Sequence, residues 1–381
     1  MIPRVLLVAF AVACASCAAS GCAPTVVAPI VEVVPARAGT SNAELIAAAR
    51  KALAGCDIEG AAATLSTAAG MGDADALGLL SEVRARQGRL SEAVESARRS
   101  TVLRPDDDTL FARLAILVLR SDPDVAGALI GERLSRHPDS PVVSVLHAEA
   151  LSANGSHEQA RSTLAALERS HPGFRAARAA AARIAMREGH FGDALELAGG
   201  LVSGTDDAAL EATLVRVSAL AQTGDLPGAT EVARSAVAKW PDHAPASAQL
   251  GGLLVKAPGQ VTAAVAVLEK AARCDRSNVA SRTNLGEALR RLGRNDEAIA
   301  VLETAVALGP TAPDAHFNLG LACLYGRANA AHPVERAECA VRSFERYVAL
   351  AGKGAVEDAD VLLQLANRFL GMEKWRAENV K

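Results

Sequence analysis

Aromatic side chains are scarce in this chain of 381 residues, of which phenylalanine, tryptophan and tyrosine make up 3%. The formal net charge at pH 7 is only −3, so neither sign of charge dominates. Proteins that bind nucleic acids typically have a basic stripe and aromatic side chains on which bases stack. The sequence therefore argues against a nucleic-acid partner.

The sequence also lacks the short motifs that carry common catalytic chemistry. It contains no phosphate-binding loop, dinucleotide-binding glycine fingerprint, HExxH helix or GxSxG elbow. Beyond the N-terminal segment, no group of cysteines and histidines has the spacing of a metal site. We therefore expect no enzymatic activity, no cofactor or metal, and no small-molecule substrate.

A single long apolar run lies at the N-terminus, where Arg4 precedes nine apolar residues from Val5 to Ala13. Small residues follow the run, which is the arrangement of a secretory signal. Nine residues are too few to cross a bilayer as a helix. No second long apolar run follows, so we expect the rest of the chain not to span a membrane.

The end of this segment resembles the lipobox of bacterial lipoproteins, in which small residues precede a cysteine that is acylated. Cys22 follows Ala19, Ser20 and Gly21, although Ala19 stands where a leucine is usual. Cys17 is a second candidate, and an ordinary cleaved signal without lipidation is a third possibility. The resemblance implies a signal peptide over residues 1–21 and a lipid anchor at Cys22.

The residue after Cys22 is Ala23 rather than aspartate, which in such lipoproteins implies the outer membrane, with the protein facing the periplasm. Prolines at Pro24, Pro29 and Pro35 favour an extended chain over residues 22–40. We expect this segment to be a tether between the lipid and the rest of the protein.

Most of the remaining chain is a repeat with a period near 34 residues. A series of eight alanines marks it, with successive gaps of 33, 34, 34, 35, 35, 34 and 42 residues: Ala93, Ala126, Ala160, Ala194, Ala229, Ala264, Ala298 and Ala340. Such a period predicts a stack of helix–turn–helix units rather than one globular core.

The clearest copy of the repeat runs from residue 279 to residue 310. Its apolar residues fall at helical spacing on two faces, and small residues stand where two helices would cross, at Gly286 and Ala298. Gly293 supplies the turn, and Pro310 separates this unit from the next. The pattern resembles the tetratricopeptide repeat (TPR) family. The resemblance implies an all-α fold, a right-handed superhelical solenoid of about eight to nine repeats.

The two ends of the array depart from the pattern. The first unit is weak, with Ala48 and Ala61 as its expected crossing residues, and we place the solenoid at residues 41–354. The last repeat has an insertion over residues 326–339, which we expect to form an edge loop that either binds a partner or is merely tolerated. Residues 355–381 are expected to form a capping helix and tail.

The TPR resemblance also implies a concave groove lined by the first helix of each repeat. It assigns eight side chains to that groove: Gln249, Asn284, Glu287, Arg290, Phe317, Asn318, Leu321 and Tyr325. The asparagines either bond a partner's backbone or brace neighbouring helices. The lysine clamp of the chaperone-binding subfamily is absent, so we expect no cytosolic co-chaperone role.

Two cysteines, Cys323 and Cys339, flank the insertion. They either form a disulfide, as an oxidising compartment would allow, or are small buried apolar residues.

These features predict a non-enzymatic, lipid-anchored periplasmic scaffold that binds proteins or peptides of the cell envelope and aids assembly of an envelope complex. The layout resembles type IV pilus pilotins and gliding-motility TPR lipoproteins. An outer-membrane regulator of a peptidoglycan synthase or hydrolase is the alternative.

Overall fold

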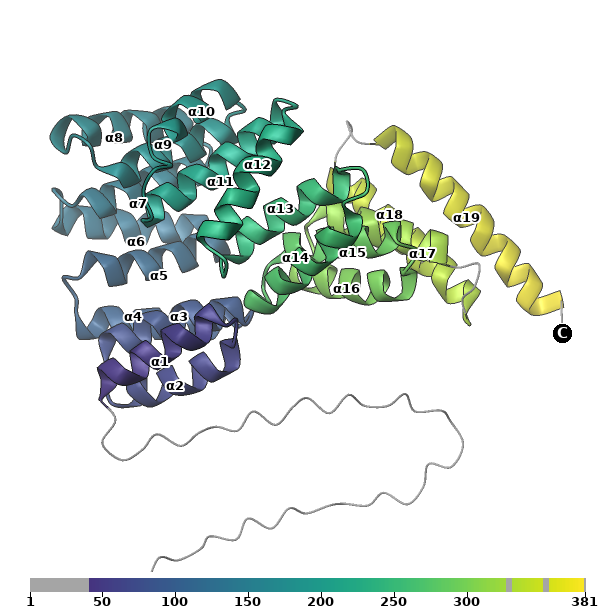
Figure 1. Cartoon of the computed structure of the whole chain (residues 1–381), viewed down its shortest axis with the longest axis horizontal. Coiled ribbons are helices and arrows are strands. Elements are labelled where there is room, and N and C mark those ends of the chain that lie inside the picture. Colours follow the sequence, from purple (N-terminus) through teal and green to yellow (C-terminus); the bar gives the residue numbers. More distant parts are fainter. Residues whose placement is uncertain (1–40, 327–330, 352–355, 380–381) are drawn as a thin grey trace, which may run out of the picture. The chain divides into compact units, whose positions relative to one another are not determined.

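The computed structural model describes residues 41–326, 331–351 and 356–379. Within these ranges every regular element is a helix, and the helices are numbered α1 to α19 along the chain (Figure 1). The expected all-α fold is therefore confirmed. In this part of the chain no helix is both long and apolar enough to cross a bilayer.

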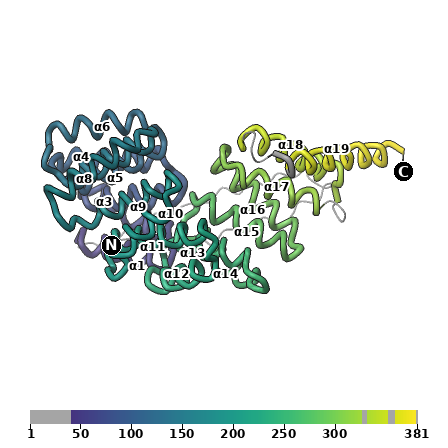
Figure 2. Tube along the Cα trace, turned by 90° about the horizontal axis from the view of Figure 1, so that it is seen from above, coloured from purple at the N-terminus to yellow at the C-terminus, as the bar shows by residue number. Residues whose placement is uncertain are grey.

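The helices form nine consecutive pairs followed by one additional helix. The first helices of the pairs are α1 (Asn42–Ala54), α3 (Ala74–Arg86), α5 (Asp108–Ser121), α7 (Pro141–Ala153), α9 (Arg175–Arg187), α11 (Asp207–Gln222), α13 (Ala244–Lys256), α15 (Val279–Arg291) and α17 (Pro313–Gly326). The second helices are α2 (Ile58–Gly70), α4 (Leu90–Leu103), α6 (Pro123–Arg136), α8 (His157–Ser170), α10 (Phe191–Gly199), α12 (Leu226–Lys239), α14 (Val261–Cys274), α16 (Asn295–Leu308) and α18 (Pro333–Ala351). The last helix is α19 (Val356–Asn379). Figure 2 shows the pairs following one another along the Cα trace.

The pair α15–α16 illustrates how the sequence produces one repeat. The side chain of Asn278 caps α15 by accepting a hydrogen bond from the backbone N–H of Ser281 at 2.9 Å. Gly293 follows α15 with a φ of 77°, a left-handed conformation that glycine adopts without steric cost. A Cβ at Gly286 would lie 2.3 Å from Cγ of Leu302, so the helices can cross this closely only because Gly286 has no side chain.

All eight alanines of the repeat series are fully buried, as the period predicts. Two crossing positions differ from expectation. In the first repeat the buried residue is Ala49, whereas Ala48 is exposed. In the third repeat the regular spacing places Leu114 at the position equivalent to Gly286. A single residue, Asp122, joins α5 to α6 there, so the register shifts by one and the small residue at the crossing is Ala115.

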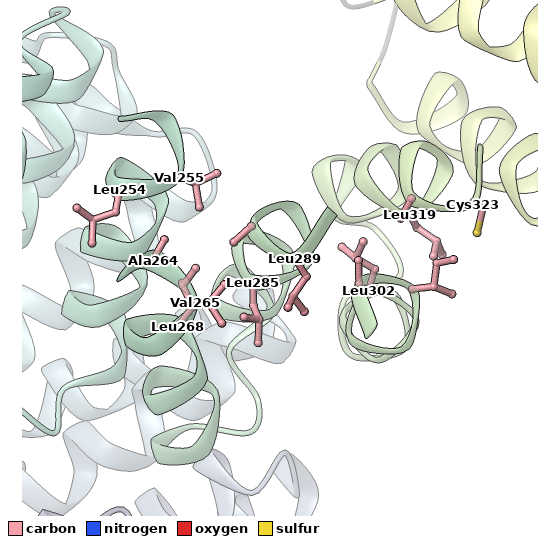
Figure 3. Packing of buried hydrophobic residues seen from close by; sticks show 14 of the residues in the cluster. Leu254, Val255, Ala264, Val265, Leu268, Leu285, Leu289, Leu302, Leu319 and Cys323 are labelled. Atoms are coloured by element: carbon pink, nitrogen blue, oxygen red, sulfur yellow. The ribbon is translucent and has the colours of Figure 1, made fainter. Parts of the chain in front are cut away.

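The core is a series of apolar clusters shared between neighbouring repeats rather than one central cluster. The largest cluster extends from α11 to α19. Figure 3 shows part of it, in which Leu268 on α14 and Leu302 on α16 each pack between the first helix of their own repeat and the next repeat. This arrangement is what a solenoid requires, because each repeat buries its apolar face only against its neighbours.

The C-terminal repeat incorporates its insertion differently from the expectation. Residues 333–339 form the first turns of α18, which begins at Pro333, so this part of the insertion is a helix extension and not an edge loop. Residues 327–330 lie outside the described residues. Leu362, Ala366 and Phe369 on α19 pack against the large cluster, as expected for a capping helix.

One buried ion pair joins α5 to α6. The guanidinium of Arg133, only 5% exposed, donates from Nη2 to Oδ1 of Asp108 at 2.6 Å and lies 5.0 Å from the ring centroid of Phe111. Burial raises the pKa of Asp108, but hydrogen bonds from Ser140 and Arg133 together lower it below its ordinary value. Asp107, the preceding residue, is the N-cap of α5.

Candidate partner-binding cavity

The amide side chains expected in the groove are used largely within the array. Nε2 of Gln249 on α13 donates to the carbonyl oxygen of Leu214 on α11 at 3.2 Å. Nδ2 of Asn284 on α15 donates to the carbonyl oxygen of Ala248 on α13 at 3.3 Å. Asn318 is buried and donates to a carbonyl of its own helix. Gln249 and Asn284 therefore brace neighbouring first helices of the array.

The charged residues of the expected groove are also partly engaged. Glu287 forms an ion pair with Arg291 on the same helix at 2.6 Å, and Arg291 donates to the carbonyl oxygen of Val255 at 2.9 Å. The guanidinium carbon of Arg290 lies 5.9 Å from the ring centroid of Tyr325, whose side chain is 58% exposed. Of the expected set, Tyr325 is the side chain most available to a partner.

Two apolar side chains of the expected groove, Phe317 and Leu321 on α17, pack within the array. The ring of Phe317 packs on Phe344 and Tyr347 of α18, with centroids 6.1 and 5.0 Å away. Leu321 packs against the large apolar cluster. Both residues are thus partly buried beside the exposed Tyr325, and their role in partner binding stays a prediction.

Cys323 of α17 and Cys339 of α18 are joined by a disulfide, with Cα atoms 6.0 Å apart. The bond lies within the last repeat and links its two helices across the insertion. It closes a short segment of chain, with a sequence separation of 16 residues.

A second disulfide, between Cys56 and Cys274, links parts of the chain that are 218 residues apart in sequence. The turn after α14 here contacts the second repeat. The backbone N–H groups of Arg276 and Ser277 both donate to the carbonyl oxygen of Arg86, at 2.7 and 3.2 Å. Residues Cys56, Glu59 and Arg86 on one side and Cys274, Arg276 and Ser277 on the other are called the closure contact below.

The conformation of Cys56 sets the first repeat apart. Its φ is 60°, and it is the one residue other than glycine with a positive φ in the described part of the chain. Glycine occupies the corresponding turn position in other repeats, for example Gly88, Gly155 and Gly293. A cysteine therefore stands where the repeat normally places glycine, and its side chain reaches Cys274.

The closure contact bounds a cavity of about 460 Å³, a size within the usual range of ligand-binding sites. Its wall comes from α3, α5, the N-terminal ends of α11 and α13, and the turn between α14 and α15, through these residues: Ser81, Glu82, Ala85, Arg86, Thr109, Ala112, Arg113, Ile116, Leu117, Arg120, Asp207, His243, Ala244, Pro245, Asp275 and Ser277. We call it the closed cavity.

The α3–α5 side of the closed cavity carries an excess of positive charge. Glu82 faces two guanidinium groups, those of Arg86 at 2.5 Å and Arg113 at 3.4 Å. Arg120, the penultimate residue of α5, is exposed, and Ile116, one turn before it, is 50% exposed although it is large and apolar. This side therefore combines an apolar patch with three cations and one carboxylate.

The opposite side is built from helix ends. Nδ1 of His243 accepts a hydrogen bond from the backbone N–H of Ala246 at 3.3 Å and so caps α13. Burial lowers the pKa of His243, more than the neighbouring carboxylate of Glu211 raises it, which favours the neutral ring. Asp275 is occupied in its own turn, where it accepts hydrogen bonds from Ser277.

Sequence reasoning placed the groove in the C-terminal repeats and missed the closed cavity in the N-terminal ones. The signal was present, because the same groove positions of the family, counted in the second repeat, fall on Glu82, Ala85 and Arg86. In the third repeat the short α5–α6 turn shifts the count of groove positions by one residue. Only the corrected register assigns Arg113 and Ile116 to the groove.

Comparisons with known proteins agree with this architecture. A family model described as tetratricopeptide repeat matches residues 46–108, 179–244 and 214–279, and a model described as TPR repeat matches residues 286–324. No curated protein sequence matches this chain.

Several solved structures are similar to this chain. A chain of the APC/C hetero-tetramer Cut9–Hcn1 superposes with a TM-score of 0.61 at 18% identity, over 80% of this chain and 58% of that chain. This protein thus spans less than two thirds of that relative. A human IFIT1 dimer with PPP-AAAA gives a TM-score of 0.50 at 14% identity, over 87% of each chain. A tetratricopeptide repeat protein from Parabacteroides merdae gives 0.44 at 15% identity, over 65% of this chain and 98% of that chain.

At these identities the structures show the fold alone. The two family models together match more than half of the chain and show that it belongs to the tetratricopeptide repeat family, whose members are typically non-catalytic scaffolds for protein–protein interaction.

Proposed function

We propose that this protein is a non-enzymatic scaffold of the bacterial cell envelope that binds a segment of a partner protein in the closed cavity. The observation that carries the proposal is the cavity itself. It presents an apolar patch at Ile116 beside the exposed guanidinium of Arg120, on rigid first helices of the repeat array.

The two disulfides support an exported location. Disulfides persist in oxidising compartments such as the periplasm and are rare in the reducing cytosol. An exported chain agrees with the secretory signal that the sequence predicts over residues 1–21, which lie outside the described residues. A lipid on Cys22 would hold the array at the outer membrane, because a lipoprotein anchor of several acyl chains binds a bilayer stably.

The lipid anchor is tested by labelling cells with a palmitate analogue. We expect label on the wild-type chain and on Cys17→Ala, and none on Cys22→Ala. Label that persists in Cys22→Ala and disappears in Cys17→Ala would move the anchor, and an unlabelled wild-type chain would remove it.

The partner is tested by crosslinking in living cells followed by affinity purification. Ile116→Glu places a negative charge in the cavity and should lose the partner, whereas Val102→Glu changes a side chain that is 74% exposed outside the cavity and should retain it. A subunit of a pilus, secretion or motility machine would support the assembly role. A peptidoglycan synthase or hydrolase would show a regulator, and a partner retained by Ile116→Glu would place binding elsewhere.

A further inference from the structure

The closed cavity exists only because two distant parts of the array meet. Its α3–α5 side belongs to the second and third repeats, and its opposite side includes Asp275 and Ser277, directly after the second helix of the seventh repeat. A linear run of repeats would leave the α3–α5 face open. What holds the two sides together therefore decides whether the cavity exists.

The noncovalent part of the closure contact is small. Its polar contacts are the two backbone hydrogen bonds to Arg86 and an ion pair between Arg276 and Glu59 at 2.7 Å, and its apolar contacts include a minor cluster around Cys274. Both side chains of that ion pair are about half exposed, and exposed pairs contribute little net stability. The disulfide is the strong link.

We propose that the Cys56–Cys274 disulfide holds the closed cavity in its binding-competent form, so that an acidic, extended polypeptide segment binds the oxidised protein and is released when this disulfide is reduced. The proposal rests on the proposed function, since it assumes that partners bind in this cavity.

The length of the occupant follows from the lining of α5. Thr109 and Arg120 are the first and last residues of α5 that line the cavity, and they are eleven residues apart, a rise of roughly 16 Å. An extended chain advances about 3.3 Å per residue, so about five residues fill that length. An extended segment of this length matches the stretch of α5 that lines the cavity.

The chemistry of the occupant follows from charge and apolar exposure. Three arginines and one glutamate line the α3–α5 side, and that glutamate is already shared between Arg86 and Arg113. The opposite side adds the carboxylates of Asp207 and Asp275, of which Asp275 is engaged by Ser277, so the excess of positive charge is confined to the α3–α5 wall that the segment would lie against. Arg120 has no ion-pair partner among the described residues, and Ile116 is the apolar side chain next to it. A segment with carboxylates on either side of an apolar side chain complements this arrangement.

Reduction takes two electrons and two protons from a dithiol reductant, breaks the Cys56–Cys274 bond and leaves two thiols. The α14–α15 turn then keeps only its weak contacts, and ordering it again on binding costs affinity. Because coupling between two equilibria is reciprocal, a bound segment should also protect the disulfide from reduction by the same factor.

The test starts from a phage-displayed random octapeptide library selected on the oxidised protein, with Ile116→Glu as the counter-selection, because a carboxylate there repels an acidic peptide and competes with it for Arg113 and Arg120. We expect peptides enriched in aspartate and glutamate around an apolar residue. A synthetic, fluorescein-labelled copy of the most enriched peptide is then the probe, and its affinity is measured by fluorescence anisotropy.

Two double variants carry the comparison. Cys56→Gly with Cys274→Ala removes the closing disulfide and restores the glycine usual at this turn, and it should lower the affinity about tenfold or more. Cys323→Ala with Cys339→Ala removes the other disulfide, away from the cavity, and should leave the affinity unchanged. Circular dichroism checks that both variants retain their helices. Wild-type protein whose disulfides are reduced with dithiothreitol should show the same loss of affinity without any substitution.

Each outcome decides one question. Equal affinity of the first double variant and the wild type would overturn the dependence on the disulfide and leave the proposed function standing. Enrichment of basic peptides would overturn the acidic occupant. A library that yields no peptide dependent on Ile116 would overturn the cavity as a binding site, and the proposed function with it.

Discussion

The substitution Gly286→Ala tests the helix crossing on which the repeat depends. Gly286 lies in the middle of α15, at the point where it crosses α16. An added Cβ would lie 2.3 Å from Cγ of Leu302 and 2.7 and 2.8 Å from its two methyl carbons. Leu302 is fully buried, so it has no space into which to retreat.

Two effects of this substitution oppose each other. Alanine is favoured over glycine inside a helix by about 1 kcal/mol. Inserting a methyl group into a closely packed site costs about 1–3 kcal/mol, and a contact this short belongs at the upper end. We therefore expect a net loss of about 1–2 kcal/mol in the free energy of unfolding. At Gly131 in α6 a Cβ would meet nothing within 4 Å, so Gly131→Ala should instead gain up to about 1 kcal/mol.

The assay is urea unfolding followed by far-ultraviolet circular dichroism, with midpoints compared because repeat arrays can unfold in more than one step. In a Leu302→Ala background the obstructing side chain is gone, and Gly286→Ala should then stabilise as Gly131→Ala does. If Gly286→Ala raises the midpoint in the wild-type chain, or lowers it equally in both backgrounds, the assigned crossing is wrong.

Three further changes test the repeat register, the buried ion pair and the response to pH. Ala298→Arg places a charge at a fully buried crossing and should cost about 4 kcal/mol or more in thermal unfolding, whereas an unchanged melt would show that the register is wrong. Asp108→Asn leaves Arg133 buried without its counter-charge and should cost about 3–5 kcal/mol, while the 90% exposed Asp106, changed to Asn, serves as the silent control. Burial lowers the pKa of His243, so its contribution to stability should be lost as pH falls below its unfolded value of about 6.5, and His243→Asn should flatten that part of a pH–stability profile.

The repeat could be predicted from the sequence because its requirements are local. The residue at position 298 must be small because two neighbouring helices cross there, and the residue at position 293 must adopt a positive φ. Alanine and glycine therefore recur at these positions with the period of the repeat. A one-residue difference in a turn is enough to mislead such a pattern. The short α5–α6 turn moved the crossing from Leu114 to Ala115 and hid the groove positions of α5.

Whether a groove residue is free or engaged depends on the neighbouring repeat. Asn284 occupies the space above Gly252, where a Cβ would lie 2.8 Å from Nδ2 of Asn284. The amide then bonds a backbone carbonyl of α13. The family positions alone assign Asn284 to the groove, and only the packing of the adjacent helix shows that part of it is used internally.

The closure contact was beyond sequence analysis for a different reason. The contact between Cys56 and Cys274 depends on the small rotations between successive repeats, added over all the repeats that separate them. The sequence of a single repeat does not reveal that total rotation. The cavity that the contact bounds was unforeseen for the same reason.

The cysteine at this contact carries a cost that can be measured apart from its bond. A residue with a side chain at a left-handed φ is less stable than glycine by roughly 1–2 kcal/mol, and Cys56 has a φ of 60°. In a chain that already has Cys274→Ala, Cys56 forms no bond with that position, so Cys56→Gly should raise the unfolding midpoint of the first repeats. Cys56→Ala, which keeps a Cβ, should not. If glycine brings no gain in that background, Cys56 is not strained, and the repeat tolerates a side chain at this turn. If it does, the natural cysteine lowers the stability of its own turn, and the link to Cys274 is what offsets the loss.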